Sequence, residues 1–228
     1  MSIESRNTLA DLIRNLQVAV ERNKLTSGAV SDAIKKLTQL GHKEYDLDKF
    51  PELADTSSFK GPIRNAPVNL AEALLWKLGK WKVYQTFAKN FNNKALKVSK
   101  TGGVVLSAFA KHLQDNNNPI YDQHAIRALW AISRDFSKDE KEKCESLLFN
   151  GSKTWKDAGS GDDGACYQLY VHRMATLCSK NNIKNDELDR LLMPLGQAIK
   201  KSTRKKRGAK STRTDHDRFV ALCWPSDG

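Results

Sequence analysis

Apolar residues recur at helical spacing along almost the whole chain, and this periodicity constrains the fold more than any other feature. The series Leu9, Leu12, Ile13 and Leu16 is typical of the buried face of an α-helix, and comparable series follow it. No segment alternates convincingly between apolar and polar residues, as a half-buried strand would. We therefore predict an all-α protein of about ten helices, without a repeat of fixed period.

Glycines, prolines and capping residues divide this pattern into separate helices. Gly41 ends the second helix, Asn69 can cap the third, and Gly79 separates the third from the fourth, which runs over residues 81–91. Residues 42–68 mix prolines with large apolar side chains, which predicts an ordered connection packed on the domain. The later helices are expected over residues 101–113, 122–133, 138–148, 164–181 and 185–200.

The helical pattern stops near residue 200, where a polar and basic stretch begins. A chain of 228 residues can form one large domain or two small ones. We predict a single compact domain over residues 1–200 and a flexible basic linker over residues 201–214. Residues 215–228 include the apolar series from Phe219 to Trp224, so we expect them to dock back on the domain. The linker would then form a basic strap tethered at both ends.

The net charge of +12 points to a polyanionic partner. Residues 200–213 contain eight basic residues and no acidic one, but the rest of the chain also carries excess positive charge. Residues 77–111 contain eight lysines and no aspartate or glutamate. Such a segment creates a positive field that attracts phosphates, so nucleic acid is the leading candidate partner.

Several classes of protein are disfavoured by the sequence. No apolar run approaches the roughly 20 residues that a membrane span needs, so we predict a cytoplasmic protein without a membrane partner. The four cysteines are widely spaced and form no C-x-x-C pair, which predicts free thiols rather than a metal or iron–sulfur site. We expect a monomer that uses no cofactor.

Two chargeable residues occupy the starts of apolar helices. Asp122 precedes the helical series Ile126, Leu129 and Trp130, where an aspartate is a favoured N-cap without any catalytic role. Lys100 stands before Thr101-Gly102-Gly103, where the positive end of the helix dipole makes a lysine unfavourable. Such a lysine can bind a phosphate, and the glycines allow either a flexible helix start or close approach of another backbone.

These two segments together resemble a known family. Lys100-Thr101-x-x-Val104-Val105-Leu106 followed by Asp122-x-His124-x-x-Arg127 is similar to the helix-hairpin-helix (HhH-GPD) DNA glycosylase superfamily, in its endonuclease III and 8-oxoguanine glycosylase-like branch. The resemblance covers residues 95–129. The chain departs from the usual pattern: Leu96-Lys97-Val98-Ser99 replaces the proline- and glycine-containing hairpin, Asp115–Asn118 lengthens the connection to Asp122, and the four-cysteine cluster of many relatives is missing. It would be a divergent member.

The resemblance implies an enzyme that removes a modified base from double-stranded DNA. In that family the aspartate corresponding to Asp122 stabilises the oxocarbenium-like deoxyribose as the N-glycosidic bond breaks. The lysine of bifunctional members, here Lys100, attacks the anomeric carbon and forms a Schiff base that permits strand cleavage. If the longer connection shifts the register, Gly102 or Gly103 would face the sugar, and the enzyme would be monofunctional, using water.

Further candidate site residues lie near these segments and in the basic linker. The flipped base would be held by a pocket, with Tyr121, Trp81 and His124 as candidate lining residues. His124 can instead orient the carboxylate, and Arg127 can either pair internally or reach a phosphate. The candidate DNA contacts are Lys97, Ser99, Thr101, Gly102, Gly103, Arg127, Arg204, Lys205, Lys206 and Arg207.

Two other classes of function stay open at the level of sequence. One is a non-catalytic DNA-binding module with the same fold, in which Asp122 is only a helix cap. The other is a helical protein-interaction domain whose basic stretch is merely solvated. Within the glycosylase interpretation, an oxidised or alkylated base would indicate base-excision repair, and a hypermodified phage base would indicate antiviral defence.

Overall fold

Ten helices and no strands make up the described part of the chain, which confirms the all-α prediction. The computed structural model describes residues 3–42, 65–93, 95, 98, 103–115, 117–149, 163–204 and 212–225. The helices are α1 (Ile3–Glu21), α2 (Ser27–Gln39), α3 (Leu70–Lys77), α4 (Trp81–Asn92), α5 (Val104–Gln114), α6 (Gln123–Ile132), α7 (Lys138–Phe149), α8 (Asp163–Asn181), α9 (Asn185–Thr203) and α10 (Asp215–Cys223).

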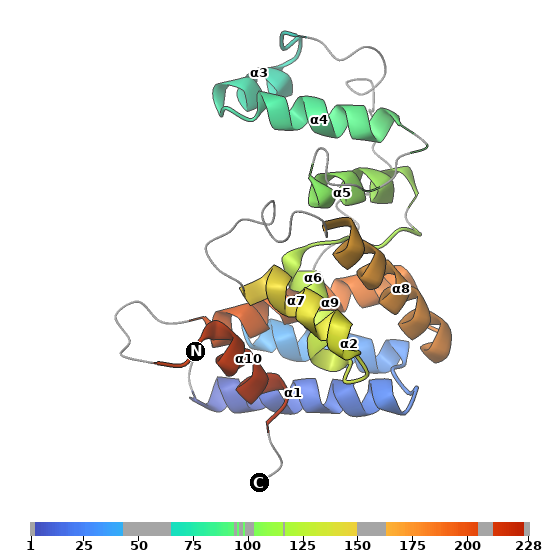
Figure 1. Ribbon diagram of the computed structural model, residues 1–228, viewed down its shortest axis with the longest axis vertical. Helices are drawn as coiled ribbons and strands as arrows, with labels where there is room; N and C mark the ends of the chain where they lie inside the picture. The colour runs from blue at the N-terminus through green and yellow to red at the C-terminus, as the bar shows by residue number, and fades with distance from the viewer. Residues whose placement is uncertain are drawn as a thin grey trace.

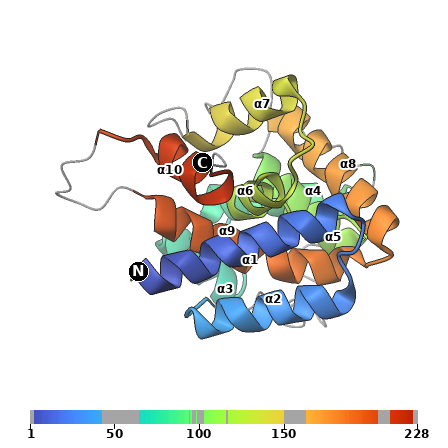
Figure 2. The same ribbon diagram turned by 90° about the horizontal axis from the view of Figure 1, so that it is seen from below.

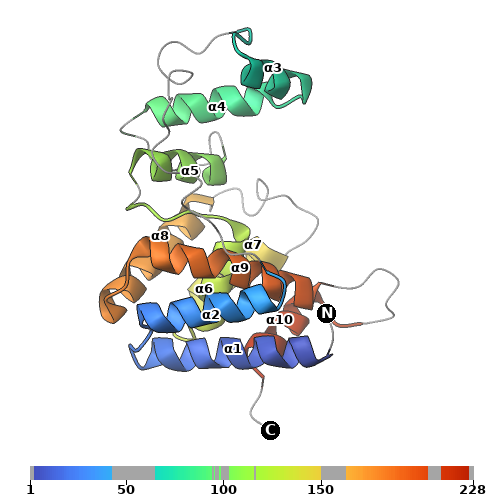
Figure 3. The same ribbon diagram turned by 180° about the vertical axis from the view of Figure 1, so that it is seen from behind.

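Helix α6 is the centre of the main bundle (Figure 1). Every residue from Ala125 to Ile132 is buried, because α9, α1, α7 and α8 all pack against this short helix. Helix α9 makes the most extensive contact with α6 and is itself covered by α2 on another side (Figures 2 and 3). A helix surrounded in this way must be apolar on almost every face, and from Ala128 to Ile132 the sequence of α6 contains no polar residue.

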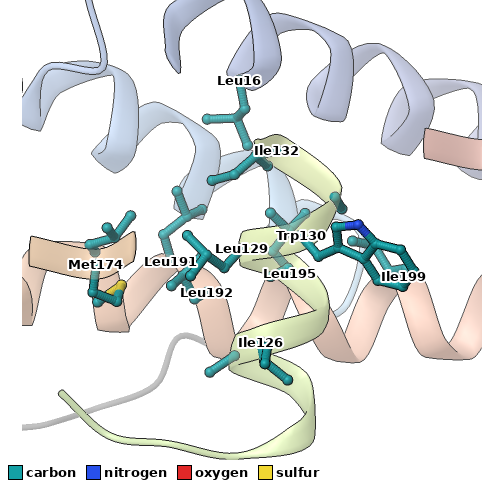
Figure 4. Packing of buried hydrophobic residues seen from close by; sticks show 14 of the residues in the cluster. Leu16, Ile126, Leu129, Trp130, Ile132, Met174, Leu191, Leu192, Leu195 and Ile199 are labelled. Carbon is teal, nitrogen blue, oxygen red and sulfur yellow. The ribbon is translucent and has the colours of Figure 1, made fainter. Parts of the chain in front are cut away.

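The core between these helices is built from apolar side chains of four elements. Figure 4 shows Leu16 of α1 and Met174 of α8 at the edges of a cluster formed by α6 and α9. The α6 and α9 members labelled there are Ile126, Leu129, Trp130, Ile132, Leu191, Leu192, Leu195 and Ile199. Their burial provides the main hydrophobic stabilisation of the bundle and fixes both ends of α6 in place.

The C-terminal helix α10 joins the bundle through aromatic side chains. Phe219 is fully buried, and its ring centroid lies 4.9 Å from that of Trp130 on α6. Trp224, the C-cap of α10, meets the Trp130 ring edge-on at 5.2 Å, and Phe149 of α7 lies 5.4 Å from Phe219. Residues far apart in the sequence are thus packed together by one aromatic cluster.

Helices α3, α4 and α5 extend from one end of the molecule (Figures 1 and 3). Helix α4 packs on α5, α3 packs on α4, and α5 in turn contacts α8. Most large apolar side chains that the described residues expose belong to α3 and its flanks, including Leu70 at 88% exposure. The lysine-rich segment over residues 77–111 begins at the last residue of α3, at the end of the molecule farthest from α1 (Figures 1 and 3).

Some predicted features lie outside the described residues. They include most of the connection over residues 42–68, the glycine-rich start at Thr101 and Gly102, and most of the basic linker. In the described segments, no helix combines the length and the apolar character required to cross a membrane.

Candidate functional site at the start of α6

Asp122 is the N-cap of α6, and one of its two carboxylate oxygens is fully engaged in this role. Oδ1 accepts hydrogen bonds from the backbone N–H groups of His124 at 2.6 Å and Ala125 at 2.7 Å. These bonds satisfy two of the amide groups that every helix leaves unpaired at its start. Oδ2 accepts no hydrogen bond from any residue that the structure describes, and the side chain is half-buried. The carboxylate is therefore rigidly held while one oxygen is available to a ligand.

A buried carboxyl group fixes the extended segment that leads into Asp122. Asp189 of α9 accepts the backbone N–H of Ile120 at 3.0 Å through Oδ2 and the hydroxyl of Tyr170 at 3.1 Å through Oδ1. Asp189 is only 4% exposed, and burial raises its pKa to about 7. The segment is also held through Asn118, whose carbonyl lies 2.7 Å from Nδ1 of His112. Helices α5, α8 and α9 thus jointly position Asp122.

The first turn of α6 lies directly on α9. A Cβ atom built on Gly196 would lie 1.9 Å from the carbonyl oxygen of His124, so the two backbones approach closely at this point. Glycine is required there by the close approach of a neighbouring backbone. One turn further along α9, Lys200 reaches back to α6, and its Nζ donates a hydrogen bond to Oε1 of Gln123 at 3.1 Å. The residue that follows Asp122 is thus hydrogen-bonded to a lysine amine of α9.

Basic groups surround this end of α6. Burial lowers the pKa of Lys200, and the positive charges of Arg127 and Arg204 lower it further, against the opposing effect of Asp122. Burial lowers the pKa of Arg127 to about 10, a value at which the guanidinium stays charged near pH 7. Burial also lowers the pKa of His124 below its ordinary value, which favours a neutral imidazole at that pH. Asp122 thus lies close to the side chains of Lys200, Arg127 and His124.

Two of the side chains predicted to contact DNA or a base are buried instead. Tyr121 is 1% exposed, and its ring packs on Tyr167 and Tyr170 at centroid distances of 5.5 Å and 5.4 Å. Tyr121 therefore belongs to the core and does not line an open base pocket. Arg127 is 3% exposed, donates to the carbonyl of Gln123 at 3.2 Å and lies 5.9 Å from the Phe149 ring centroid. Of its two predicted roles, internal pairing matches this position, and phosphate contact does not.

The other predicted site residues are distributed unevenly. His124 is half-buried and follows Asp122 on α6, so it lies within the site. Trp81 begins α4 and stacks on Tyr84 at 5.2 Å, and α4 lies beyond α5 as seen from α6 (Figures 1 and 3). The structure therefore does not bring Trp81 to Asp122.

The glycine and lysine positions around residue 100 are described only in part. Gly103 is the N-cap of α5 with a φ of +85°, so α5 begins at Val104 rather than at the predicted Thr101. Arg204 is the exposed C-cap of α9. The predicted residues Lys97, Ser99, Lys100, Thr101, Gly102, Lys205, Lys206 and Arg207 lie outside the described residues.

Sequence reasoning missed three residues that complete the site. Asp189 and Lys200 reach it through contacts across 69 and 77 positions of the chain, which no local pattern reveals, and Gln123 is distinguished by its bond to Lys200. In the sequence, Lys200 is distinguished only as the first residue of the basic stretch. Within the described ranges, no group of three or more His, Cys, Asp or Glu side chains is arranged to hold a metal ion.

Comparison with known proteins gives no relative from which to infer a function. No protein-family model, no curated protein and no solved structure matches the chain.

Proposed function

We propose that the protein is a DNA glycosylase that excises a modified base and leaves an abasic site, with Asp122 as the catalytic carboxylate. The observation that supports this most is that the two oxygens of the Asp122 carboxylate are in different environments. Oδ1 is fixed by two backbone N–H groups, and Oδ2 is uncommitted within the described structure.

The chemistry of the reaction fits a carboxylate held in this way. As the bond between C1′ and the base breaks, the deoxyribose gains positive charge of the same kind as in glycoside hydrolysis. A negative charge fixed in advance beside C1′ stabilises that transition state and can orient the attacking water. The N-cap bonds hold Asp122 in position before the substrate arrives, so little reorganisation is needed during the reaction.

The charge distribution supports binding to DNA. Lys200 lies in the last turn of α9 beside the first turn of α6, and Arg204 is the exposed C-cap of α9, from which the sequence continues into the basic linker. Clustered positive charges attract the phosphate backbone of DNA, and this attraction weakens as the salt concentration rises. The backbone would then be held near Asp122, with the target nucleotide flipped out of the stack.

A second function is favoured by the same capping geometry. Asp122 is well explained as an N-cap alone, and a non-catalytic DNA-binding module would need only the basic surface. The two functions differ in one observable, the release of a free base.

The test is to incubate the purified protein with two sets of DNA. One is a panel of duplexes carrying oxidised and alkylated bases, and the other is phage DNA with hypermodified bases. Released bases are identified by mass spectrometry, and DNA binding is measured in parallel at several salt concentrations. Asp122→Asn is the informative variant, because the Asn oxygen can still cap α6.

We expect base release that Asp122→Asn abolishes without a comparable loss of binding. The class of substrate that reacts would distinguish base-excision repair from defence against phage. Salt-dependent binding without release from any substrate would favour the non-catalytic module. Absence of both release and binding would overturn the DNA-directed function altogether.

A further inference from the structure

Helix α3 exposes apolar side chains that a helix of its composition normally buries. Of the seven large apolar side chains that the described residues leave exposed, six lie within residues 68–83. They form what we call the apolar tip and are Val68, Leu70, Leu74, Trp76, Leu78 and Val83. The contact of α3 with α4 leaves these side chains in water. Exposed apolar side chains gathered in this way mark a surface that binds another molecule or a membrane.

The only carboxylate of α3 faces inward and holds this helix on α4. Glu72 is buried, and its Oε1 accepts a hydrogen bond from the hydroxyl of Tyr84 at 2.6 Å. Its Oε2 accepts the backbone N–H of Val68 at 2.8 Å. Helix α3 thus buries its carboxylate while Leu70 and Leu74 are exposed, the reverse of the usual arrangement on a helix that faces water.

The surface around the apolar tip is positive. Lys77, Lys80 and Lys82 are exposed, and none forms an ion pair with a residue that the structure describes. Glu72 is the only acidic residue in the sequence from 65 to 93, and it is buried. The tip therefore combines leucine and tryptophan side chains with lysines whose charge is not neutralised. This combination is typical of helices that lie in the interface of an anionic bilayer.

A bilayer with anionic headgroups matches both properties of the apolar tip. Its phosphates attract the lysines, and the adjoining acyl chains take up the leucines, with tryptophan at the boundary. DNA would pair with the lysines but leave the leucines in water. Two copies of this chain that met through the tip would place like charges opposite each other, because a two-fold contact pairs each patch with itself.

The place of α3 in the molecule suits contact with a flat surface. Helices α3 and α4 extend from the end farthest from α1 (Figures 1 and 3), so the apolar tip can meet a plane before the main bundle does. The expectation of no membrane partner rests on the absence of a spanning run, and a helix that lies on the surface of a bilayer needs no such run.

We propose that the apolar tip is a membrane-docking site, which binds the protein to bilayers that contain anionic phospholipids. The leucines and Trp76 enter the boundary between headgroups and acyl chains, and the three lysines contact the headgroup phosphates. This inference goes beyond the proposed function and does not depend on it.

The test is flotation of the full-length protein with lipid vesicles. One set of vesicles contains phosphatidylcholine and phosphatidylglycerol in equal amounts, and the other contains phosphatidylcholine alone. Leu70→Gln combined with Leu74→Gln removes apolar contact at two exposed positions of the tip. Val18→Gln is the control, because it removes an exposed apolar side chain of α1. Circular dichroism melts show whether each variant is folded.

A second pair of variants tests the lysines. Lys77→Gln combined with Lys80→Gln removes two charges beside the apolar tip. Lys24→Gln combined with Lys36→Gln removes the same charge from exposed positions before and on α2.

We expect the wild-type protein and both controls to float with the anionic vesicles and not with phosphatidylcholine alone. Each double variant at the tip should weaken partitioning by about tenfold or more, because it removes either buried apolar area or attraction to the headgroups. Absence of flotation, or equal flotation with both sets of vesicles, would overturn the proposal. Flotation that the leucine variant leaves unchanged would do the same, since the lysines alone would then account for it.

Trp76 reports whether the apolar tip is the part that enters the bilayer. Vesicles with brominated acyl chains quench the fluorescence of a tryptophan that touches those chains. We expect quenching in the wild type that is largely lost in Trp76→Phe, a variant that keeps an apolar ring and should still float. Quenching that persists in Trp76→Phe would place the contact elsewhere and contradict the proposal.

Two further measurements identify the other occupants. A wild-type protein that dimerises in sedimentation velocity, without floating, and becomes monomeric in the leucine variant would assign the tip to a second copy of the chain. Loss of DNA binding in the leucine variant, without flotation of the wild type, would assign the tip to DNA. Either result overturns membrane docking. Base release is measured without vesicles and flotation without modified DNA, so failure of the proposed function and failure of this inference are distinguishable.

Discussion

Gly196 of α9 lies against the backbone carbonyl of His124 of α6, so closely that a Cβ atom would come within 1.9 Å of that oxygen. The carbonyl carbon and the Cα of His124 would lie 2.5 Å and 2.8 Å from the same Cβ atom. No flexible side chain can move aside, because all three atoms belong to the backbone. The position of the first turn of α6, and with it Asp122, therefore depends on this glycine.

Gly196→Ala should destabilise the protein even though alanine favours helices. Alanine gains about 1 kcal/mol of helix propensity over glycine, but the clash forces α6 and α9 apart and overpacks the core. We expect a net loss of about 2 kcal/mol or more in the free energy of unfolding, measured by urea titration. Base release should also fall, because Asp122 moves with α6.

Gly28→Ala is the matched control for this substitution. Gly28 lies in the first turn of α2, and an added Cβ there would meet only Oγ1 of Thr26 at 3.8 Å, an ordinary contact. This variant should be as stable as the wild type or more stable. If both variants unfold at the same urea concentration, the close approach at Gly196 has no energetic consequence.

The sequence predicts much of the secondary structure because caps and helical spacing are local. Asp122 could be assigned as an N-cap from the apolar series that follows it, and α6 begins one residue later. The start of α5 was misplaced because Gly103, with its positive φ, acts as the N-cap and the helix begins after it.

The composition of the site was less predictable because it depends on how distant helices pack. Tyr121 looked like a pocket wall, since an aromatic residue beside a catalytic candidate fits that role as well as it fits a core. Its burial against Tyr167 and Tyr170 is decided by the position of α8. Lys200 was one of eight basic residues in its stretch, and only its contact with Gln123 distinguishes it.

The observed capping role of Asp122 and its proposed catalytic role can be separated by substitution. Asp122→Ala removes the acceptor for the N–H groups of His124 and Ala125 and should cost about 1 kcal/mol in the free energy of unfolding. Asp122→Asn keeps an oxygen acceptor, so its stability should stay within about 0.5 kcal/mol of the wild type. Both variants should lack base release. Full activity in the folded Asn variant would assign Asp122 to capping alone.

Gln17 is a buried amide that completes the C-terminal ends of two helices. Its Nε2 donates to the carbonyls of Ala131 at 2.7 Å and Cys223 at 2.8 Å, and its Oε1 accepts from Arg134 at 2.9 Å. Carbonyls at helix ends lack intrahelical partners, so loss of the amide leaves buried polar groups unsatisfied.

Gln17→Leu, which keeps a similar size, should therefore lower the free energy of unfolding by about 2 to 4 kcal/mol. Gln197→Leu replaces an exposed glutamine of α9 and should change stability little. Urea titration of both variants checks the comparison. Equal stabilities would mean that water replaces the amide without loss.

Asp189 should give the protein a pH-dependent stability of unusual sign for a carboxyl group. Burial raises its pKa from 3.8 to about 7, so the folded protein holds the proton more tightly than the unfolded chain does. Below about pH 4 the group is protonated in both states. Between about pH 4 and pH 7 only the unfolded chain releases its proton, so stability falls as pH rises, and above that range the difference stays constant.

Asp189→Asn tests this because the amide cannot ionise, while its oxygen can still accept the N–H of Ile120. The lowered pKa values of His42 and His124 act in the opposite direction, since they add stability as pH rises through their unfolded range near 6.5. The informative quantity is therefore the difference between the two proteins in urea titrations at pH 4, 5.5 and 7. We expect the variant to gain a few kcal/mol relative to the wild type across this range. A difference that does not change with pH would show that the Asp189 carboxyl keeps an ordinary pKa in the folded state.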